Sequence, residues 1–481
     1  MLKKNNIIVF TVAILFIALA VFYISIEKYY FAALPFGIAM LLMALYSFDK
    51  MFYLIALLAP VSLQLRFFMT VENDLSLPIE PFLFGILLIV LFKFIFENKS
   101  FNRKLLTHPI SIAIYVNFIW IVITSITSTM PLVSLKFALS RMWFITAFYI
   151  MTLHLFMNLK NMYRYFWMYI GSFVIVIVYT LIRQSTYGFF NKQAANFVVA
   201  PFLPDHTSYG AILALLIPFI FYFVFSKQFS GIKRSMSFLV GVLYIVALIF
   251  SYTRAAWIGI LLSVGLLVLL LLKIKGRTLV VLSGVLLAVL LTFSSQIIMH
   301  LERNQQDSSD NLMEQVSSVT NIKTDASNLE RINRWNCAIR MFQEKPIVGF
   351  GPGTYMFQYA PFQFSTEQTI ISTNFGEVGN AHSEFLGPLA ESGVLGALTY
   401  IIILVLTGIS TFRVFQSDNS KEIRWLAMSL FLGLVSYYVH GFLNNFLDID
   451  KFSLLFWGYT AAIVVIDVVY RSDKSKSISS T

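Results

Sequence analysis

Long apolar runs occupy most of this chain, and one of them reads WIGILLSVGLLVLLLL over residues 257–272. A helix that crosses a bilayer needs about 20 mostly apolar residues. The whole chain fits this requirement, because 58% of its 481 residues are hydrophobic and only 12% are charged. Soluble domains carry roughly 25% charged residues. The sequence therefore predicts an all-α polytopic membrane protein.

Fourteen apolar segments can be distinguished, and they predict about 12–14 transmembrane helices. They cover residues 7–26, 30–48, 51–65, 81–96, 109–127, 138–157, 163–182, 208–226, 235–251, 255–272, 278–298, 388–410, 425–442 and 453–470. The chain divides accordingly into four parts. Residues 1–298 hold helices 1–11, residues 299–387 form a large outer loop with short helices, residues 388–470 hold helices 12–14, and residues 471–481 form a cytoplasmic tail.

Lysines and arginines are concentrated in alternate loops, beginning with Lys3 and Lys4 before the first segment. Cytoplasmic loops carry such an excess. Both termini are therefore predicted to be cytoplasmic, and residues 299–387 to be outside. The net charge of +11 has the same explanation and gives no reason to expect nucleic acid as a partner. A single cysteine, Cys337, leaves no internal disulfide to form.

The large outer loop contains one helical pattern, in the stretch NLERINRWNCAIRMF. Apolar residues recur there at helical spacing and form one stripe, made of Leu329, Ile332, Trp335, Ile339 and Phe342. Ser327 or Asn328 is available as the N-cap. The tryptophan and the flanking arginines suit a helix that lies on the outer membrane surface.

Arg254 stands where the stretch SYTRAAW, residues 251–257, enters the tenth apolar segment. Inserting an arginine into the bilayer costs a free energy of about 2.5–3.5 kcal/mol at the centre of a transmembrane helix and less near the interface. One interpretation is snorkelling, in which the guanidinium reaches lipid phosphates and Trp257 anchors the interface. The other is a guanidinium fixed at the membrane surface to hold a phosphate or diphosphate with two hydrogen bonds.

His382 lies in AHSEFLGPLAESG, just before the twelfth segment, on the same predicted outer surface as Arg254. Histidine changes its protonation near neutral pH, which is the property a general base needs. A capping or surface histidine is the alternative interpretation. His206, in FLPDHTSYG, is also predicted to be outside and is the second candidate for the base.

Three more arginines on the predicted outer side are candidates for further phosphate ligands, namely Arg141, Arg183 and Arg331. Arg331 shares a helix face with Arg334 at i, i+3. In the alternative interpretation, each of these arginines is an ordinary surface charge that contacts water or lipid head groups. Glu391 lies about one turn into the twelfth segment, where an acid is usually paired and functional. Helix capping or packing would explain it equally well.

Two other patterns favour a structural interpretation. The turn PIVGFGPGTY offers free backbone N–H groups that can form an anion-binding nest, but it lacks the context of a nucleotide-binding motif. Asp448 and Asp450 are spaced as a metal pair, yet two acids at i, i+2 recur by chance. The sequence therefore predicts no metal site.

Three motifs occur in order over about residues 245–410: SYTRAAWIGI, then ERINRWNCAIRMFQEKPIVGFGPGTY in the outer loop, then AHSEFLGPLAESGVLGALTY. This ordered trio resembles the O-antigen ligase and O-antigen polymerase superfamily. The resemblance implies a GT-C-like membrane glycosyltransferase that needs no metal, nucleotide or other cofactor. One departure is visible, because asparagine commonly follows the histidine in the family and Ser383 stands there in this chain.

The resemblance further implies inverting transfer of a glycan from a polyprenyl (undecaprenyl) diphosphate carrier to an acceptor hydroxyl, at the periplasmic face of a bacterial inner membrane. It places arginines such as Arg254 on the diphosphate and His382 as the base. The partners are then the carrier-linked donor, a glycan, lipid or protein acceptor, and membrane lipids.

The sequence leaves ligase, polymerase and protein O-glycosylation open. A polysaccharide flippase is the alternative from another class. A transporter should place polar groups along a midplane path, whereas here they gather in the outer loops.

Overall fold

The structure is a computed structural model. It describes residues 48–64, 76–96, 102–272, 326–369, 371–373 and 379–471, with short pieces at 14–19, 21–23, 43, 278 and 284. Residues 1–55 and 56–481 form two compact units. Most of the predicted segments 7–26, 30–48 and 278–298 lie outside the described residues, as do residues 299–325 of the predicted outer loop and the tail after Arg471.

Nearly all the regular structure is helical. The elements before the first long gap are α3 (Phe48–Leu58), α4 (Ile79–Phe96), α5 (Arg103–Leu106), α6 (Pro109–Ile126), α7 (Pro131–Phe144), η3 (Ile145–Ile150), α8 (Met151–Leu155), α9 (Leu159–Tyr187), α10 (Lys192–Val198), α11 (His206–Phe225), α12 (Gly231–Phe250) and α13 (Arg254–Leu271). The elements after it are α17 (Ala326–Glu344), α18 (Tyr355–Gln358), η4 (Ala360–Phe362), α19 (Leu386–Gln416), α20 (Lys421–His440), α21 (Asp450–Val465) and η6 (Ile466–Tyr470).

Eight helices within the described residues are long and apolar enough to cross a membrane. They are Pro109–Ile126, Pro131–Leu155, Leu159–Tyr187, His206–Phe225, Gly231–Phe250, Arg254–Leu271, Leu386–Gln416 and Asp450–Tyr470. Each one coincides with a predicted apolar segment. The prediction of an all-α polytopic membrane protein is therefore confirmed.

The predicted segment 51–65 differs from the structure. Helix α3 ends at Leu58, and a turn leads into the strand β1 (Leu63–Gln64), which pairs antiparallel with β2 (Ser76–Leu77). Pro60 cannot continue a helix. The buried Lys451 ammonium donates to the Pro60 carbonyl at 3.4 Å and the Ser62 carbonyl at 2.6 Å, which fixes the turn. An apolar run is thus split between a short helix and a loop.

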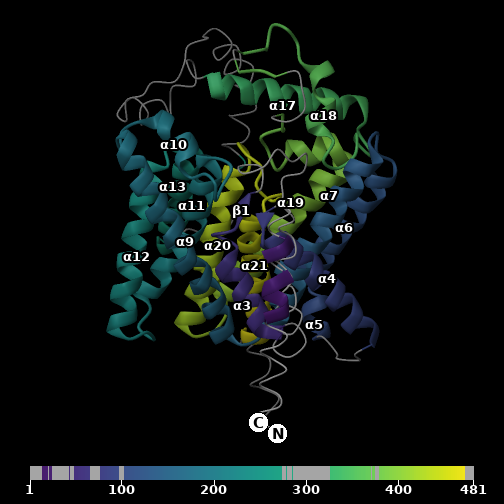
Figure 1. Ribbon diagram of the computed structural model, residues 1–481. Helices are drawn as coiled ribbons and strands as arrows, with labels where there is room; N and C mark the ends of the chain where they lie inside the picture. The colour runs from purple at the N-terminus through teal and green to yellow at the C-terminus, as the bar shows by residue number, and fades with distance from the viewer. Residues whose placement is uncertain are drawn as a thin grey trace. The chain divides into compact units, whose positions relative to one another are not determined.

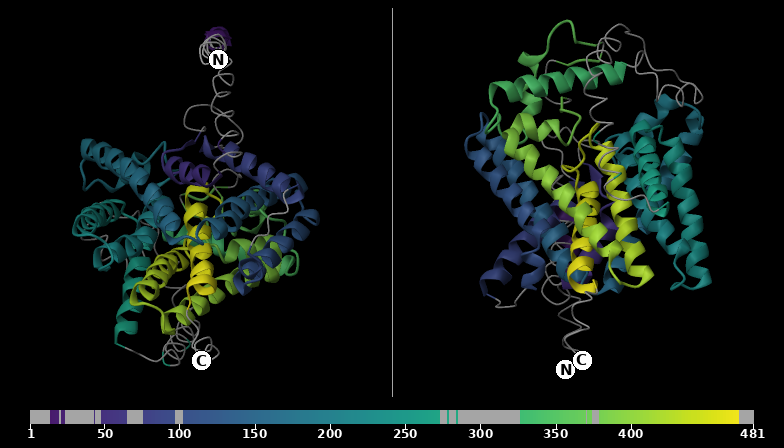
Figure 2. Two further views of the ribbon diagram at one scale, coloured as in Figure 1. Left: turned by 90° about the horizontal axis from the view of Figure 1, so that it is seen from below. Right: turned by 180° about the vertical axis from the view of Figure 1, so that it is seen from behind.

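Helix α21 lies at the centre of the larger unit, and every residue from Asp450 to Val465 is buried (Figure 2). Small residues let the surrounding helices approach one another closely. A Cβ at Gly259 in α13 would collide with the Ser436 carbonyl of α20, and one at Gly433 in α20 would collide with the Leu215 carbonyl of α11. These contacts hold α11, α13 and α20 together as one group of helices.

Helix α17 crosses one end of this bundle, above α19 (Figure 1). The helix predicted over the stretch NLERINRWNCAIRMF is confirmed, although it begins at Ala326, before both predicted caps, and its position on the outer side stays a prediction. Its buried face is polar in one half, with Glu330, Asn333 and Arg334, and apolar in the other, with Cys337, Ala338 and Met341. Arg334 donates to Glu330 at 2.6 Å, so the burial of both charges is compensated. The apolar stripe is only half-buried, with Ile339 exposed, and its contact with the membrane stays a prediction.

Candidate functional site

Arg254 is the first residue of α13, and a tight turn places it beside the start of α11. Tyr252 in that turn has a left-handed backbone with φ of 52°. The Thr253 hydroxyl donates to the His206 carbonyl at 2.7 Å. Gly210 makes this approach feasible, because a Cβ there would lie 2.6 Å from Thr253. Left-handed backbone at a non-glycine residue is costly and is held only by strong surrounding contacts.

His382 lies in the loop that leads into α19 and has the same unusual backbone, with φ of 46°. Its N–H donates to the Asn380 side chain at 2.9 Å, and its own side chain is half-buried. His382 itself therefore has this left-handed backbone, and Arg254 lies two positions after Tyr252, which has it too. Such residues cluster at functional sites.

Shared charges connect these two positions. Arg254, Arg331 and Asp205 are all close enough for their charges to act on the His206 imidazole. Arg331 and Asp205 also act on His382. The structure thus gathers the start of α11, the start of α13, α17 and the loop before α19 at one end of the bundle. The first and last of these segments are more than 170 positions apart in the sequence.

The protonation of His382 reflects this environment. Burial lowers the pKa of its imidazole to about 3, and the charges of Arg331 and Arg334 lower it in the same direction. Asp205 opposes them. The imidazole is therefore neutral at physiological pH and able to accept a proton.

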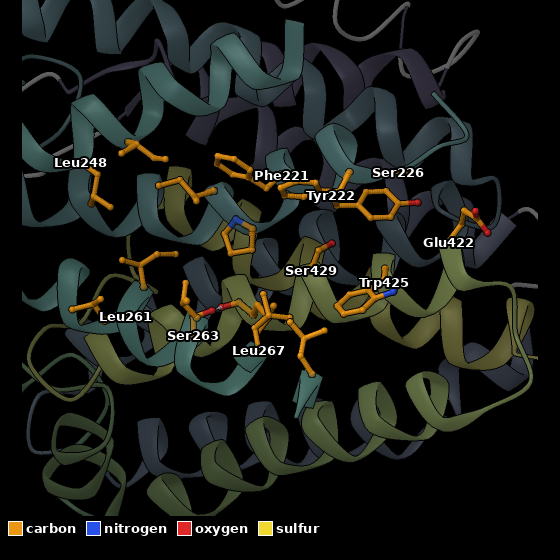
Figure 3. A pocket seen from close by; sticks show the side chains of 18 of the residues that line it. Phe221, Tyr222, Ser226, Leu248, Leu261, Ser263, Leu267, Glu422, Trp425 and Ser429 are labelled. Carbon is orange, nitrogen blue, oxygen red and sulfur yellow. Dashed lines mark hydrogen bonds between the residues drawn. The ribbon is translucent and has the colours of Figure 1, made fainter. Parts of the chain in front are cut away.

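An apolar groove of about 990 Å³ extends along α13 from the first turn after Arg254. Helices α11, α12, α13 and α20 form its walls, and Figure 3 shows their side chains converging on it. Polar groups gather at the end remote from Arg254, among them Ser226, Lys227, Lys421 and Glu422. The groove is therefore apolar along most of its length, and its charged lining residues lie at the end remote from Arg254.

A family model described as O-antigen ligase matches residues 239–401. This match covers about a third of the chain and supports its resemblance to the O-antigen ligase and polymerase superfamily. No curated protein matches the chain. The matched residues, here called the O-antigen ligase domain, agree closely with the 245–410 region of the ordered motifs. They support a membrane protein of the class that joins or polymerises glycans.

The O-antigen ligase domain contains Arg254, Arg331 and His382, whereas His206 lies before it. Arg331 and Arg334 differ although they are three positions apart on α17. Arg331 is half-buried and donates to the Leu443 carbonyl at 3.1 Å. Arg334 is 2% exposed, and its guanidinium carbon lies 3.9 Å from the Tyr359 ring centroid. Both charges act on His382, but of the two it is Arg331 that also acts on His206 and has part of its surface exposed.

Two other candidate arginines are engaged in internal contacts. Arg183 donates to the Ala200 carbonyl at 2.7 Å and closes the loop after α10. Arg141 forms an ion pair of 2.7 Å with Asp448 and donates to the Leu447 carbonyl at 3.2 Å. These contacts give both arginines a structural function. Binding of the diphosphate by either one stays a prediction.

Glu391 occupies the nest that the glycine turn offers. The Tyr355 N–H donates to its carboxylate at 2.9 Å, and the Gly351 N–H donates to its carbonyl at 2.8 Å. Gly393 breaks the helical geometry of α19 with φ of 67°, and a Cβ there would collide with the Ile347 carbonyl. The anion that this turn binds is therefore an internal carboxylate, which supports the structural interpretation of the turn.

No three potential metal ligands among histidine, cysteine, aspartate and glutamate lie together in the part of the chain that the structure describes. The pair considered from the sequence is divided between two environments. Asp448 is half exposed and paired with Arg141. Asp450 is 2% exposed at the start of α21.

Glu384 was not selected from the sequence, yet it fixes the loop that carries His382. Its carboxylate accepts hydrogen bonds from the Phe446 N–H at 2.7 Å, the Leu447 N–H at 2.9 Å and the Tyr437 hydroxyl. Its own N–H donates to the Gly441 carbonyl at 2.7 Å. Burial, and next the charge of Asp448, raise the pKa of Glu384 to about 7. The only sequence signal was its position two residues after His382.

Glu384→Ala should lower the rate of glycan transfer at least about tenfold, because three donors lose a buried acceptor and the strained His382 loop is released. Donor binding should change little. Glu384→Gln keeps an acceptor oxygen and should retain most of the rate. The measurement is kcat and donor affinity for each variant in reconstituted protein. Equal losses in both substitutions, or weakened donor binding, would contradict a positioning function.

Proposed function

We propose that this protein is an inverting glycosyltransferase of the bacterial inner membrane. It transfers a glycan from a polyprenyl diphosphate carrier to an acceptor hydroxyl at the periplasmic face. One observation carries the proposal. Arg254 and His382 are 128 positions apart, yet Arg254 lies close to His206, and His206 and His382 share the charges of Arg331 and Asp205 at one end of the bundle.

The chemistry assigns different tasks to the two residues. The acceptor oxygen attacks the anomeric carbon of the donor, and His382 takes the proton of the acceptor hydroxyl. The bond between the anomeric carbon and the diphosphate oxygen breaks, and its electron pair leaves with the diphosphate. Arg254 and Arg331 stabilise the negative charge that grows there, which is usually the largest contribution to such catalysis. Direct displacement inverts the anomeric configuration.

The proposal predicts transfer by the purified protein alone, reconstituted in liposomes with a carrier-linked glycan and a hydroxyl acceptor. Transfer should continue in EDTA, because the arginines take the part that a cation would otherwise have at the diphosphate. The measurement is the amount of glycan released from the carrier and joined to the acceptor. No transfer at all, or transfer that EDTA stops and magnesium or manganese restores, would overturn the proposal.

The glycans of a deletion strain identify the acceptor. Loss of capped lipid together with intact carrier-linked polymer indicates a ligase, which is the reaction we propose. Carrier-linked single repeats indicate a polymerase, and loss of glycan from protein indicates protein O-glycosylation.

A further inference from the structure

The loop that carries His382 packs against two stacked tyrosines. Tyr355 begins the short helix α18 and Tyr359 follows that helix, and their ring centroids lie 5.6 Å apart with the planes inclined by 8°. Both rings are buried. Ala381, the residue directly before His382, is buried in the same apolar cluster as the two rings. Packing therefore holds the backbone on the N-terminal side of His382.

Arg334 of α17 fixes these two rings. Its guanidinium lies over the face of Tyr359, a favourable contact between a cation and an aromatic ring. The same guanidinium donates to the Thr373 hydroxyl at 3.0 Å, and the Tyr359 hydroxyl donates to the Thr373 carbonyl at 2.6 Å. The Tyr355 hydroxyl donates to the Arg334 carbonyl at 2.7 Å. Stacking and hydrogen bonds thus leave little freedom to either ring.

Gly379, three positions before His382, is where the loop comes closest to this surface. A Cβ at Gly379 would lie 2.2 Å from the Tyr359 ring and 2.8 Å from the Arg334 guanidinium. Carbon atoms pack at about 3.5 Å from one another. Because the ring is buried and fixed, even a methyl group at Gly379 would push the loop away by about 1 Å. The absence of a side chain is therefore what lets the loop lie on the ring.

We infer that Arg334, Tyr359 and Gly379 are positioning residues for His382. The inference rests on the proposed function, in which His382 takes the proton of the acceptor. Glu384 fixes the loop after His382, so the base is held from both sides. A general base must lie within hydrogen-bond reach of its proton, and a misplacement of about 1 Å can cost about 10²-fold in rate.

The inference also gives α17 two separate tasks. Arg331, which is assigned to the diphosphate, and Arg334, which supports the His382 loop, lie three positions apart on this helix. Loss of the contact at Gly379 should therefore slow the chemical step and leave donor binding intact. A contact that serves only to stabilise the fold would lower the amount of folded protein without lowering its kcat.

Two matched glycine substitutions test this separation. Gly387 lies in the first turn of α19, and a Cβ there would be 3.7 Å from Ala381, which is an ordinary contact. Gly379→Ala should lower kcat about 10- to 100-fold, with donor affinity changed less than twofold. Gly387→Ala should resemble the wild type in both. The measurements are kcat and donor affinity per amount of folded protein, in liposomes with a carrier-linked glycan and a hydroxyl acceptor.

Arg334→Lys tests the same contact from its other side. The lysine keeps a positive charge but loses the planar group that covers the ring, so kcat should fall about tenfold or more while donor affinity stays within twofold. Substitutions that act through one contact are not additive. The double variant with Gly379→Ala should therefore lose little more kcat than the more severe of the two single variants.

Three results would overturn the inference: wild-type kcat in folded Gly379→Ala, a loss of donor affinity as large as the loss of kcat, or single losses that multiply in the double variant. If Gly379→Ala does not fold, the kcat of Arg334→Lys decides, and a wild-type value overturns the inference. Absence of transfer by the wild-type protein would instead overturn the proposed function itself.

Discussion

Replacing His382 with alanine should slow glycan transfer by about 10²–10⁴-fold, the usual effect of removing a general base. Donor binding should stay nearly intact, because His382 acts on the proton of the acceptor. The measurement is single-turnover transfer from a carrier-linked glycan, with donor affinity determined separately and the amount of folded protein checked for each variant.

His206→Ala is the informative comparison, since His206 is surrounded by the same charges of Arg331 and Asp205. It should retain far more of the rate than His382→Ala. If His382→Ala keeps nearly the full rate, or loses donor binding as severely as an arginine substitution, His382 is not the base. His206 would then be the residue to examine.

The pH dependence supplies an independent check of the same assignment. The pKa of His382 is lowered to about 3 in the free protein, so its imidazole stays neutral and reactive above that pH. A bound diphosphate offsets the charges of Arg331 and Arg334 and should raise the pKa. The acid limb of kcat, which reports the complex, should therefore lie at higher pH than that of kcat/KM, which reports the free enzyme. If the acid limbs of kcat and kcat/KM lie at the same pH, the bound diphosphate does not change the pKa of His382, and this explanation fails.

Arg254→Ala should weaken donor binding by about 10- to 150-fold, the range that corresponds to the loss of a charge-assisted hydrogen bond. It should also slow transfer, because the leaving diphosphate loses a fixed positive charge. Arg254→Lys should rescue only part of both, since an ammonium replaces a planar fork by a point charge. The measurements are donor affinity and transfer rate for both variants.

Arg234 provides the control for a general effect of removing an arginine. It lies near the start of α12, at the opposite end of that helix from the turn that leads to Arg254, and donates to the Val224 carbonyl at 2.9 Å. Arg234→Ala should leave donor affinity and rate unchanged. If Arg254→Ala binds donor as the wild type does, the arginine is an interfacial anchor, the alternative that the sequence left open.

The membrane fold could be predicted from the sequence because hydropathy and helix length are local properties. Each helix of the described residues that is long and apolar enough to cross a membrane follows an apolar segment, and the helix over the NLERINRWNCAIRMF stretch was found by its spacing. The segment 51–65 was the exception. Its hydropathy is that of a span, but Pro60 and contacts from a lysine almost 400 positions away shape it into a turn.

The sequence by itself also selected Arg254 and His382, because a charge beside a long apolar run is conspicuous and the order of the motifs is characteristic of a family. Only the tertiary structure decided which other groups accompany them. Arg331 is half-buried and its charge acts on both His206 and His382, whereas Arg334, three positions later, is buried against Glu330. Glu384 fixes the His382 loop through backbone groups of residues 441–447. Such roles depend on which distant segments of the chain come into contact. Residue type and spacing along one sequence do not determine these contacts.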